Sequence, residues 1–240
     1  MLYLLDGSPP DTPFPDPALA ETEPNGLLAV GGDLSPRRLL QAYKAGVFPW
    51  YSDDQPILWW SPDPRMVLFP EQLQVSRSLR KTLRRGHFEV SVDQAFGDVI
   101  RACAGPRKDE PGTWLLPEMI AAYESLHRLG LAHSVETWCD GELVGGLYGL
   151  NLGRAFFGES MFSRRTDASK VALVQLSELA AQAGFAFIDC QVYTEHLQRL
   201  GAQEIPRTRF LDLLQQAQTE PPLADWPRPP RSTRNLEAAR

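Results

Sequence analysis

The apolar positions along the chain change their spacing several times, and each spacing predicts a different element. Over residues 36–45 they fall mostly on one face of a helix, which Ser35 is placed to cap and Gly46 to end. Over 77–85 leucines recur at helical spacing on one side, which predicts a second helix. Later segments keep the same period and are each closed by a glycine: 117–129, 167–182 and 195–200.

Strand patterns gather in the second half of the chain. Segments 133–139 and 142–150 flank Asp140-Gly141, a turn typical of a hairpin, and 154–162 predicts a third strand. The continuous apolar run 185–188 predicts a buried strand, and 204–205 a short final one. The predicted fold class is therefore α+β. A hairpin meander, a helix and then a buried strand resemble the order of the acetyltransferase-like (GNAT) fold, a likeness that carries no function by itself.

Proline-rich stretches indicate how the chain is divided. The stretch at 61–64, Ser-Pro-Asp-Pro, is the best internal boundary, because each proline restricts itself and the residue before it. We therefore expect a small N-terminal domain over 1–63 and a GNAT-like domain over 64–240. Prolines also crowd the first 24 residues and the segment 221–240, which predicts an extended arm at one end and a tail at the other.

Composition narrows the class of protein. Of the 240 residues 43% are hydrophobic and 22% charged, which excludes an intrinsically disordered chain. No run approaches the ~20 apolar residues of a membrane span, and the first residues form no signal peptide, so we expect no membrane partner. Three cysteines without a CxxC pair fit a reduced, cytoplasmic protein and offer no metal framework.

One predicted helix has a strongly basic face, although the net charge of the protein is −6. The helix predicted over 77–85 gathers five basic side chains within an arc of roughly 140°, and no acidic residue interrupts them. A solvated amphipathic helix would look the same, but the local field favours contact with phosphates. This basic face consists of Arg77, Arg80, Lys81, Arg84 and Arg85.

Polar side chains with possible chemistry follow two predicted strands. Glu159 and Ser160 lie near the end of the third strand, and Asp189 and Gln191 lie at the carboxyl end of the buried one. Strand ends of this kind hold ligands in open sheets, although a structural salt bridge or a cap would also explain either carboxylate. Alternation places Asp189 and Gln191 on one face, so we expect Cys190 to be a packed thiol despite the nearby His196.

Aromatic residues crowd two short segments, Phe48-Pro49-Trp50-Tyr51 and Trp59-Trp60. They are explained equally well by the core of a small domain and by a platform that stacks on a base or another ligand.

Several long motifs in order resemble one family, the leucyl/phenylalanyl-tRNA–protein transferases. They are PNGLLAVGGDL at 24–34, GVFPW at 46–50, WWSPDPR at 59–65, GESMFS at 158–163 and IDCQ at 188–191. The resemblance covers residues from about 23 to about 214. It implies the transfer of Leu or Phe from aminoacyl-tRNA to proteins with N-terminal Arg or Lys, which marks them for degradation, and a GNAT-like C-terminal domain.

The resemblance also suggests roles for individual residues. The basic face would hold the tRNA acceptor stem, Trp50 and Trp114 would form the aminoacyl-adenosine site, and Tyr123 would lie in the same cleft. Leu147 would line the apolar amino-acid pocket, where a relative has Met, and Ser160 would also bind substrate. Thr194 stands where the family leads us to expect Asn.

The implied mechanism asks little of the protein, because the donor is an activated ester and the attacking α-amine has a pKa of about 7.7–8.0. We expect Gln191 to orient that amine, Asp189 to hold Gln191, and Glu159 to bind an ammonium group. No metal or cofactor is required, and we expect a monomer.

Three alternatives remain. A CoA-dependent acetyltransferase would need a glycine-rich loop where 164–169 has no glycine. A non-catalytic RNA-binding module would leave the polar cluster of Glu159, Asp189 and Gln191 unexplained. The third alternative is a related transferase with a different donor or acceptor residue.

Overall fold

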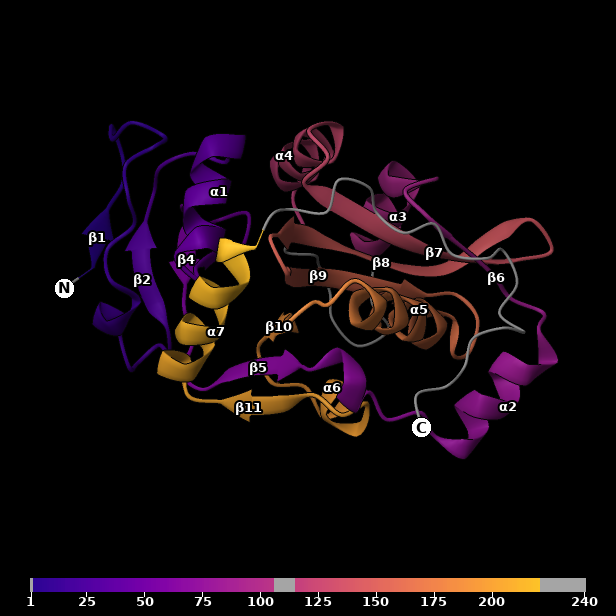
Figure 1. The fold of residues 1–240 in the computed structure, drawn as a ribbon. Coiled ribbons are helices and arrows are strands. Elements are labelled where there is room, and N and C mark those ends of the chain that lie inside the picture. The colour runs from indigo at the N-terminus through magenta and orange to yellow at the C-terminus, as the bar shows by residue number, and fades with distance from the viewer. Residues whose placement is uncertain (1, 106–114, 221–240) are drawn as a thin grey trace.

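The computed structural model describes residues 2–105 and 115–220, which form two sheets (Figure 1). The first sheet has the strand order β1-β2-β4-β3, and the second has the order β11-β5-β10-β9-β8-β7-β6. The strands of the first sheet are β1 (Tyr3–Leu4), β2 (Leu27–Val30), β3 (Phe48–Pro49) and β4 (Leu58–Trp60). Those of the second are β5 (Arg65–Leu68), β6 (Glu89–Val92), β7 (Ala132–Cys139), β8 (Glu142–Leu152), β9 (Ala155–Ser163), β10 (Phe187–Gln191) and β11 (Gln203–Ile205).

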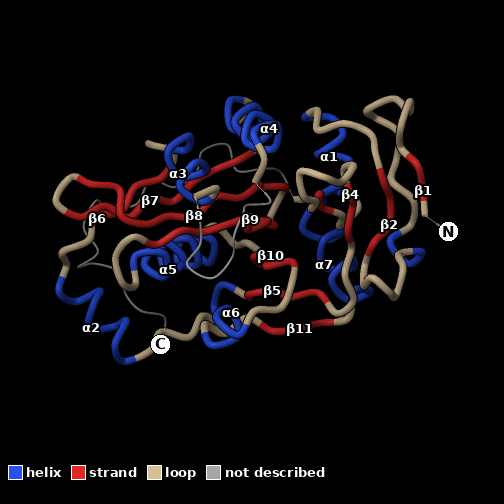
Figure 2. The backbone as a smooth tube through the Cα atoms, turned by 180° about the vertical axis from the view of Figure 1, so that it is seen from behind, coloured by secondary structure: helices blue, strands red, loops and turns tan. Residues whose placement is uncertain are grey.

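Helices cover both faces of the larger sheet. In Figures 1 and 2, α5 lies on one face, and α3 and α4 lie on the other. The helix α7 runs beside α1 where the two sheets meet. The helices are α1 (Pro36–Lys44), α2 (Arg77–Arg85), α3 (Phe96–Cys103), α4 (Pro117–Arg128), α5 (Ala168–Gln182), α6 (Glu195–Arg199) and α7 (Arg207–Thr219), with short 3-10 turns at Pro17–Leu19 and Pro70–Gln72.

The predicted class, α+β with a small N-terminal domain, is confirmed. The cap predicted from the sequence is present, because Ser35 Oγ accepts the Arg38 backbone N–H at 3.3 Å at the start of α1. At the β7–β8 turn, Asp140 and Gly141 take φ values of 54° and 78°, which a hairpin turn of this type requires. From β7 to α6 the order is a meander, a helix, a parallel strand and a short helix, as predicted for a GNAT-like domain.

The two sheets meet in a short segment between β4 and β5. We propose the domain boundary there, at residues 63 and 64.

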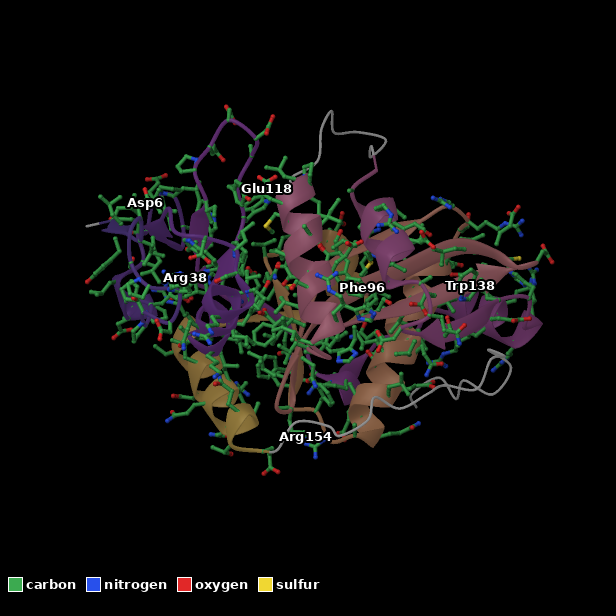
Figure 3. The ribbon with its side chains drawn as sticks, turned by 90° about the horizontal axis from the view of Figure 1, so that it is seen from above. Asp6, Arg38, Phe96, Glu118, Trp138 and Arg154 are labelled. Carbon is green, nitrogen blue, oxygen red and sulfur yellow. The ribbon has the colours of Figure 1, made fainter. Side chains whose placement is uncertain are left out.

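The N-terminal arm is less free than its prolines suggest, because it supplies β1, which pairs in parallel with β2. Arg38, buried inside this domain (Figure 3), donates to the carbonyls of Ser8 at 3.0 Å and Pro9 at 2.7 Å and fixes the arm. The tail, 221–240, lies outside the described residues.

Two apolar cores flank the larger sheet. One includes Tyr43, Phe157 and Phe210 and joins α1, α4 and α7 to the sheet. The other includes Leu79, Val171 and Phe156 and joins α2 and α5 to it. Among helices of the described residues, none is long and apolar enough to span a bilayer.

Candidate active site

A cavity of about 410 Å³ opens where the two domains meet the carboxyl end of β10. Its floor is polar and is formed by Glu159, Asp189 and Gln191. Its walls are mostly apolar and come from β8, β9, β10, α5 and α6, with the β3 segment of the N-terminal domain on one side. The apolar wall residues include Phe48, Leu147, Met161, Leu173, Leu176, Ile188 and Leu197.

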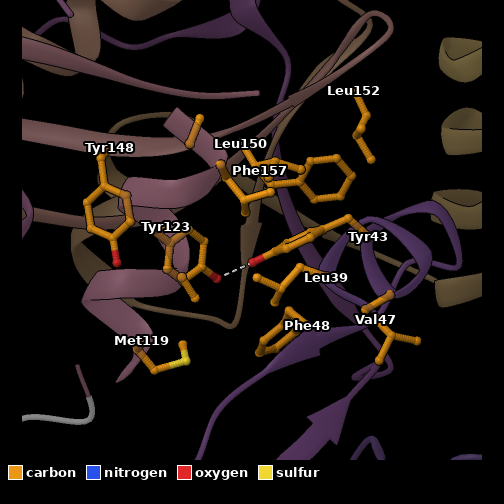
Figure 4. Packing of buried hydrophobic residues seen from close by; sticks show 14 of the residues in the cluster. Leu39, Tyr43, Val47, Phe48, Met119, Tyr123, Tyr148, Leu150, Leu152 and Phe157 are labelled. Atoms are coloured by element: carbon orange, nitrogen blue, oxygen red, sulfur yellow. Dashed lines mark hydrogen bonds between the residues drawn. The ribbon is translucent and has the colours of Figure 1, made fainter. Parts of the chain in front are cut away.

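Three side chains contact the Glu159 carboxyl at hydrogen-bond distance. Tyr43 Oη, from α1, lies 2.7 Å from Oε1, and Tyr123 Oη, from α4, lies 2.8 Å from Oε2. Gln191 Nε2 donates to Oε1 at 2.7 Å. The two tyrosine hydroxyls also bond to each other, as the dashed line in Figure 4 shows. Glu159 is 8% exposed, so this network replaces water around its carboxyl.

Burial changes the protonation of this group. Removal from water raises the pKa of Glu159 to about 7, more than the bonds from Tyr43 and Tyr123 lower it. Burial likewise raises the pKa of both tyrosines well above 10, so both hydroxyls keep their protons. Glu159 is therefore a carboxyl that titrates near neutral pH.

Asp189 has a different environment, although it lies on the same floor. Arg65 Nε donates to its Oδ1 at 2.9 Å and Arg65 Nη2 to its Oδ2 at 2.7 Å, and both side chains are fully buried. This two-point pairing satisfies a charged carboxylate. The structural salt bridge considered for Asp189 is present, and it coexists with a place beside the cavity.

Hydrogen bonds to the backbone and to the side chain of Gln191 fix its conformation. Its backbone N–H donates to Asp189 Oδ1 at 2.9 Å, and its φ of 64° lies in the left-handed region. Asp189 therefore holds Gln191 through the backbone, while Glu159 holds its side-chain nitrogen. Among the described residues no hydrogen bond reaches Gln191 Oε1, which remains an acceptor for a molecule in the cavity.

Cys190 is a packed thiol, as expected, because it packs against the core that includes Leu79 and Val171. The expected alternation of Asp189 and Gln191 with Cys190 is wrong. The pairing of β10 with β5 shifts register between Asp189 and Gln191, and this bulge brings all three consecutive residues to the cavity. Burial raises the pKa of the Cys190 thiol, so it stays protonated. His196 also lines the cavity, and burial lowers its pKa, which keeps the ring neutral.

The structure brings most of the predicted substrate residues together. Trp50, Leu147 and Ser160 line the cavity, and Trp50 is 46% exposed. Tyr123 does not line it: the side chain is fully buried behind Glu159 and reaches the cavity only through that carboxyl. Trp114 lies outside the described residues. Thr194 lines the cavity and also caps α6, since its Oγ1 accepts the Leu197 N–H at 3.2 Å.

The basic face lies apart from this cavity, on α2. In Figures 1 and 2 this helix is at the opposite end of the molecule from β1. Leu79 and Leu83 are buried on its inner side, while all five basic residues are exposed. Within 2–105 and 115–220 none of the five forms a salt bridge, so their charges face solvent.

Two side chains that contact the polar floor of the cavity could not be identified from the sequence. Arg65 belongs to a recognised motif, but nothing local indicates that it pairs with Asp189, 124 positions away. Tyr43 lies among the apolar positions of the helix predicted over 36–45, which accounts for its buried ring but gives no sign that its hydroxyl contacts Glu159.

Comparison with known proteins places this site in a family. Residues 67–215 match the family model described as leucyl/phenylalanyl-tRNA protein transferase, and residues 32–63 match the model of its N-terminal domain. A relative from Nitrosomonas eutropha named leucyl/phenylalanyl-tRNA–protein transferase is 59% identical over 211 residues, 88% of this chain and 90% of the relative. One of the same name from Aromatoleum aromaticum is 62% identical over 210 residues, 88% of this chain and 87% of the relative.

Solved structures are more distant. The structure of L-PGS from Bacillus licheniformis gives a TM-score of 0.39 at 13% identity, covering 71% of this chain and 57% of that one. A GCN5-related N-acetyltransferase from Kribbella flavida gives 0.36 at 14% identity, covering 70% and 60%. At these scores the likeness carries no argument about the site. The sequence matches decide the assignment: the chain belongs to the leucyl/phenylalanyl-tRNA–protein transferase family and has the activity of that family.

Proposed function

We propose that this protein transfers leucine or phenylalanine from aminoacyl-tRNA to the α-amino group of proteins that begin with Arg or Lys, creating a degradation signal. The observation that most directly supports this proposal is a single cavity with apolar walls and a polar floor. Leu147, Met161 and Ile188 offer an apolar surface for the side chain of the donor amino acid. Glu159 and Gln191 line the same cavity, and we place the ester and the amine beside them.

Two features support tRNA as the carrier of the amino acid. Trp50 is exposed beside the cavity, where its ring is free to stack on a terminal adenine, and Ser160 offers a hydroxyl to the same substrate. The basic face on α2 would hold the acceptor stem by its phosphates, without reading bases. Trp114, which the family resemblance adds to the adenosine site, lies outside the described residues.

The reaction needs orientation more than strong acid–base chemistry. The neutral α-amine attacks the ester carbonyl carbon, a C–N bond forms, and the bond from that carbon to the ribose 3′-oxygen breaks. The proton lost by nitrogen goes to the departing oxygen, through the neighbouring ribose hydroxyl or water. Holding both reactants in one cavity supplies most of the rate.

Gln191 is the orienting residue in this proposal. With Nε2 bound to Glu159, its Oε1 accepts a hydrogen bond from the attacking amine and aims the nitrogen lone pair at the ester. A side-chain amide is too weak a base to take the proton itself. Asp189 fixes the backbone of Gln191 and so acts as a positioning residue.

We also propose that the protein works in the cytoplasm as a monomer. Aminoacyl-tRNA, the donor, is a cytoplasmic substrate. On the described surface the exposed large apolar side chains belong to separate short segments, at 2–4, 19, 50, 129 and 192–193, which we take as support for a monomer.

A transfer assay tests the function. Purified protein is given radiolabelled Leu-, Phe- and Met-tRNA with peptides that begin with Arg, Lys or Ala. Leu and Phe label on the Arg and Lys peptides, but not on the Ala peptide, is the expected result. Label on other peptides would indicate a transferase with a different acceptor, and salt-sensitive tRNA binding without transfer would indicate a binding module.

The Gln191 proposal has its own variants. Gln191→Ala and Gln191→Glu should both lower the single-turnover rate, because neither keeps an amide bound to Glu159. Full rates in both would show that Gln191 does not orient the amine.

A further inference from the structure

Glu159 and two tyrosines form a closed ring of oxygen contacts. Tyr43 Oη contacts Glu159 Oε1 at 2.7 Å, and Tyr123 Oη contacts Glu159 Oε2 at 2.8 Å. The ring closes through the contact between the two tyrosine hydroxyls, which point at each other in Figure 4. All three side chains are buried, so no bulk water enters the ring.

The three oxygen–oxygen contacts of the ring need three protons. Each of the three oxygen–oxygen contacts is a hydrogen bond only if one proton lies between its two atoms. Tyr43 and Tyr123 supply one proton each, and burial raises the pKa of both, so neither supplies less. Two protons leave one of the contacts without a hydrogen bond. The third proton has one remaining source, the carboxyl of Glu159.

The fourth contact fixes the direction of the ring. Gln191 Nε2 donates to Oε1 at 2.7 Å, and Tyr43 also approaches Oε1, so Oε1 is the carbonyl oxygen with two lone pairs in use. Oε2 therefore carries the proton and donates it to Tyr123. Tyr123 then donates to Tyr43, and Tyr43 donates back to Oε1.

We propose that Tyr43 and Tyr123 hold Glu159 as a neutral carboxylic acid, and that this neutral group keeps the acceptor amine in its uncharged, nucleophilic form. The second half rests on the proposed function, which supplies the amine. An ionised carboxylate on the cavity floor would favour the ammonium form of that amine. An ammonium group has no lone pair with which to attack the ester. A neutral Glu159 replaces the ammonium-binding role that we expected from the sequence.

The other charged and titratable groups around the cavity agree with a neutral floor. The charge of Asp189 is matched by Arg65, which binds both of its oxygens. Burial lowers the pKa of His196 on α6 and raises that of Cys190 on β10, so both are neutral. Tyr148, on β8, is fully buried, and its ring packs edge-on against that of Tyr123.

Tyr43 is a positioning residue in this proposal. It is fully buried, does not line the cavity and acts only through Glu159. It belongs to α1 of the N-terminal domain, whereas Tyr123 and Glu159 belong to the larger domain. The N-terminal domain therefore sets the charge of a carboxyl in the other domain.

Carbon-13 NMR of protein labelled at the glutamate side-chain carboxyls tests the first half directly, without substrate. Comparison with Glu159→Gln identifies the Glu159 resonance, and Tyr123→Phe, which shifts the same resonance, provides a second assignment if the first variant does not fold. At about pH 6, where an ordinary glutamate with a pKa of about 4.3 is ionised, the Glu159 signal should be that of a protonated acid. A carboxylate signal at that pH would overturn the proposal, whatever the protein transfers.

Transfer rates test the second half. Glu159→Gln keeps the ring, because its Nε2 donates to Tyr123 while its Oε1 accepts from Tyr43 and Gln191, and Glu159→Ala removes it. The single-turnover rate of the Gln variant should exceed that of the Ala variant by about tenfold or more, the worth of one or two hydrogen bonds. The wild-type rate should level off as Glu159 ionises with rising pH, and the rate of the Gln variant should continue to rise with the free amine. Equal loss in both variants would show that Glu159 acts as an anion.

Discussion

Arg65 and Asp189 form a two-point ion pair from which water is excluded. The Arg65 guanidinium also lies 4.7 Å from the ring centroid of Phe48 and 4.5 Å from that of Phe210, and its Nη1 donates to the Gly46 carbonyl at 3.2 Å. The pair therefore joins the larger sheet to the N-terminal domain and to α7. Through Asp189 Oδ1, which accepts the Gln191 backbone N–H at 2.9 Å, the pair is linked to the strand end that carries Gln191.

Removing one partner of this pair should be costly. Asp189→Ala leaves the Arg65 charge buried without a counter-charge, for which we expect a loss of about 3–5 kcal/mol in the free energy of unfolding. Chemical denaturation measures this loss, with Asp212→Ala on the exposed side of α7 as the matched control. Equal stability of the two variants would contradict the inference that the Arg65–Asp189 pair is buried and that its charges depend on each other.

Removing the Tyr43 hydroxyl should affect turnover and leave tRNA binding unchanged. Tyr43→Phe keeps the buried ring and breaks the contacts with Glu159 and Tyr123, so we expect kcat to fall about tenfold and KM for aminoacyl-tRNA to stay constant. Tyr51→Phe is the control, because its hydroxyl bonds Glu118 at 3.3 Å instead. Steady-state kinetics should separate the two variants, and a matching loss in both would point to a general effect on the domain.

Stability should depend on pH through Glu159. Its pKa is raised from 4.5 to about 7, so the folded state binds the proton more tightly than the unfolded state does. The resulting stabilisation is complete below pH 4.5 and is lost as pH rises to about 7. The full change is on the order of 3 kcal/mol.

Comparison with Glu159→Gln isolates this effect from other titrating groups. Because Gln is neutral and keeps the ring, the two proteins should have similar unfolding free energies at low pH, and the wild type should lose stability relative to the Gln variant as pH rises to about 7. A difference that stays constant between about pH 5 and 8 would show that Glu159 is not perturbed.

The basic face on α2 should control the salt dependence of tRNA binding. Arg80→Ala and Arg84→Ala should each weaken binding and lower the slope of log K against log salt by about 1, the value for one phosphate contact. Arg209→Ala removes an exposed charge on α7 and serves as the control. Binding measured at several salt concentrations decides the point, and unchanged slopes would place the acceptor stem elsewhere.

Leu147 should tune the choice of amino acid. It is almost fully buried and lines the apolar wall, so Leu147→Ala enlarges the pocket. We expect the ratio of Phe to Leu transfer to rise by up to about tenfold, in line with the modest discrimination of apolar pockets. Competition between the two charged tRNAs measures the ratio, and an unchanged ratio would mean that Leu147 does not contact the donor side chain.

Local signals in the sequence were enough for much of this fold. The cap at Ser35 and the turn at Asp140-Gly141 depend on neighbours within a few residues, so the sequence shows them directly. Glu159 and Gln191 could be selected because polar residues at the end of an apolar strand are conspicuous.

The arrangement of the site depended on long-range contacts that no local pattern shows. Arg65 meets Asp189 across 124 positions, and Tyr43 meets Glu159 across 116. The bulge in β10 depends on its pairing with β5, which broke the simple alternation expected for Cys190. Each of these three features depends on tertiary packing, which the spacing of residue types along the chain does not show.

The enclosure of Arg65 has a consequence for biosynthesis. Phe210, which covers one face of the guanidinium, lies on α7 and leaves the ribosome after almost all of the described chain has been made. Until then the ion pair beneath the cavity stays open to water on that side. A nascent chain or a proteolytic fragment that lacks α7 therefore has every residue of the polar cavity floor but lacks Phe210, which covers the Arg65 side of the ion pair.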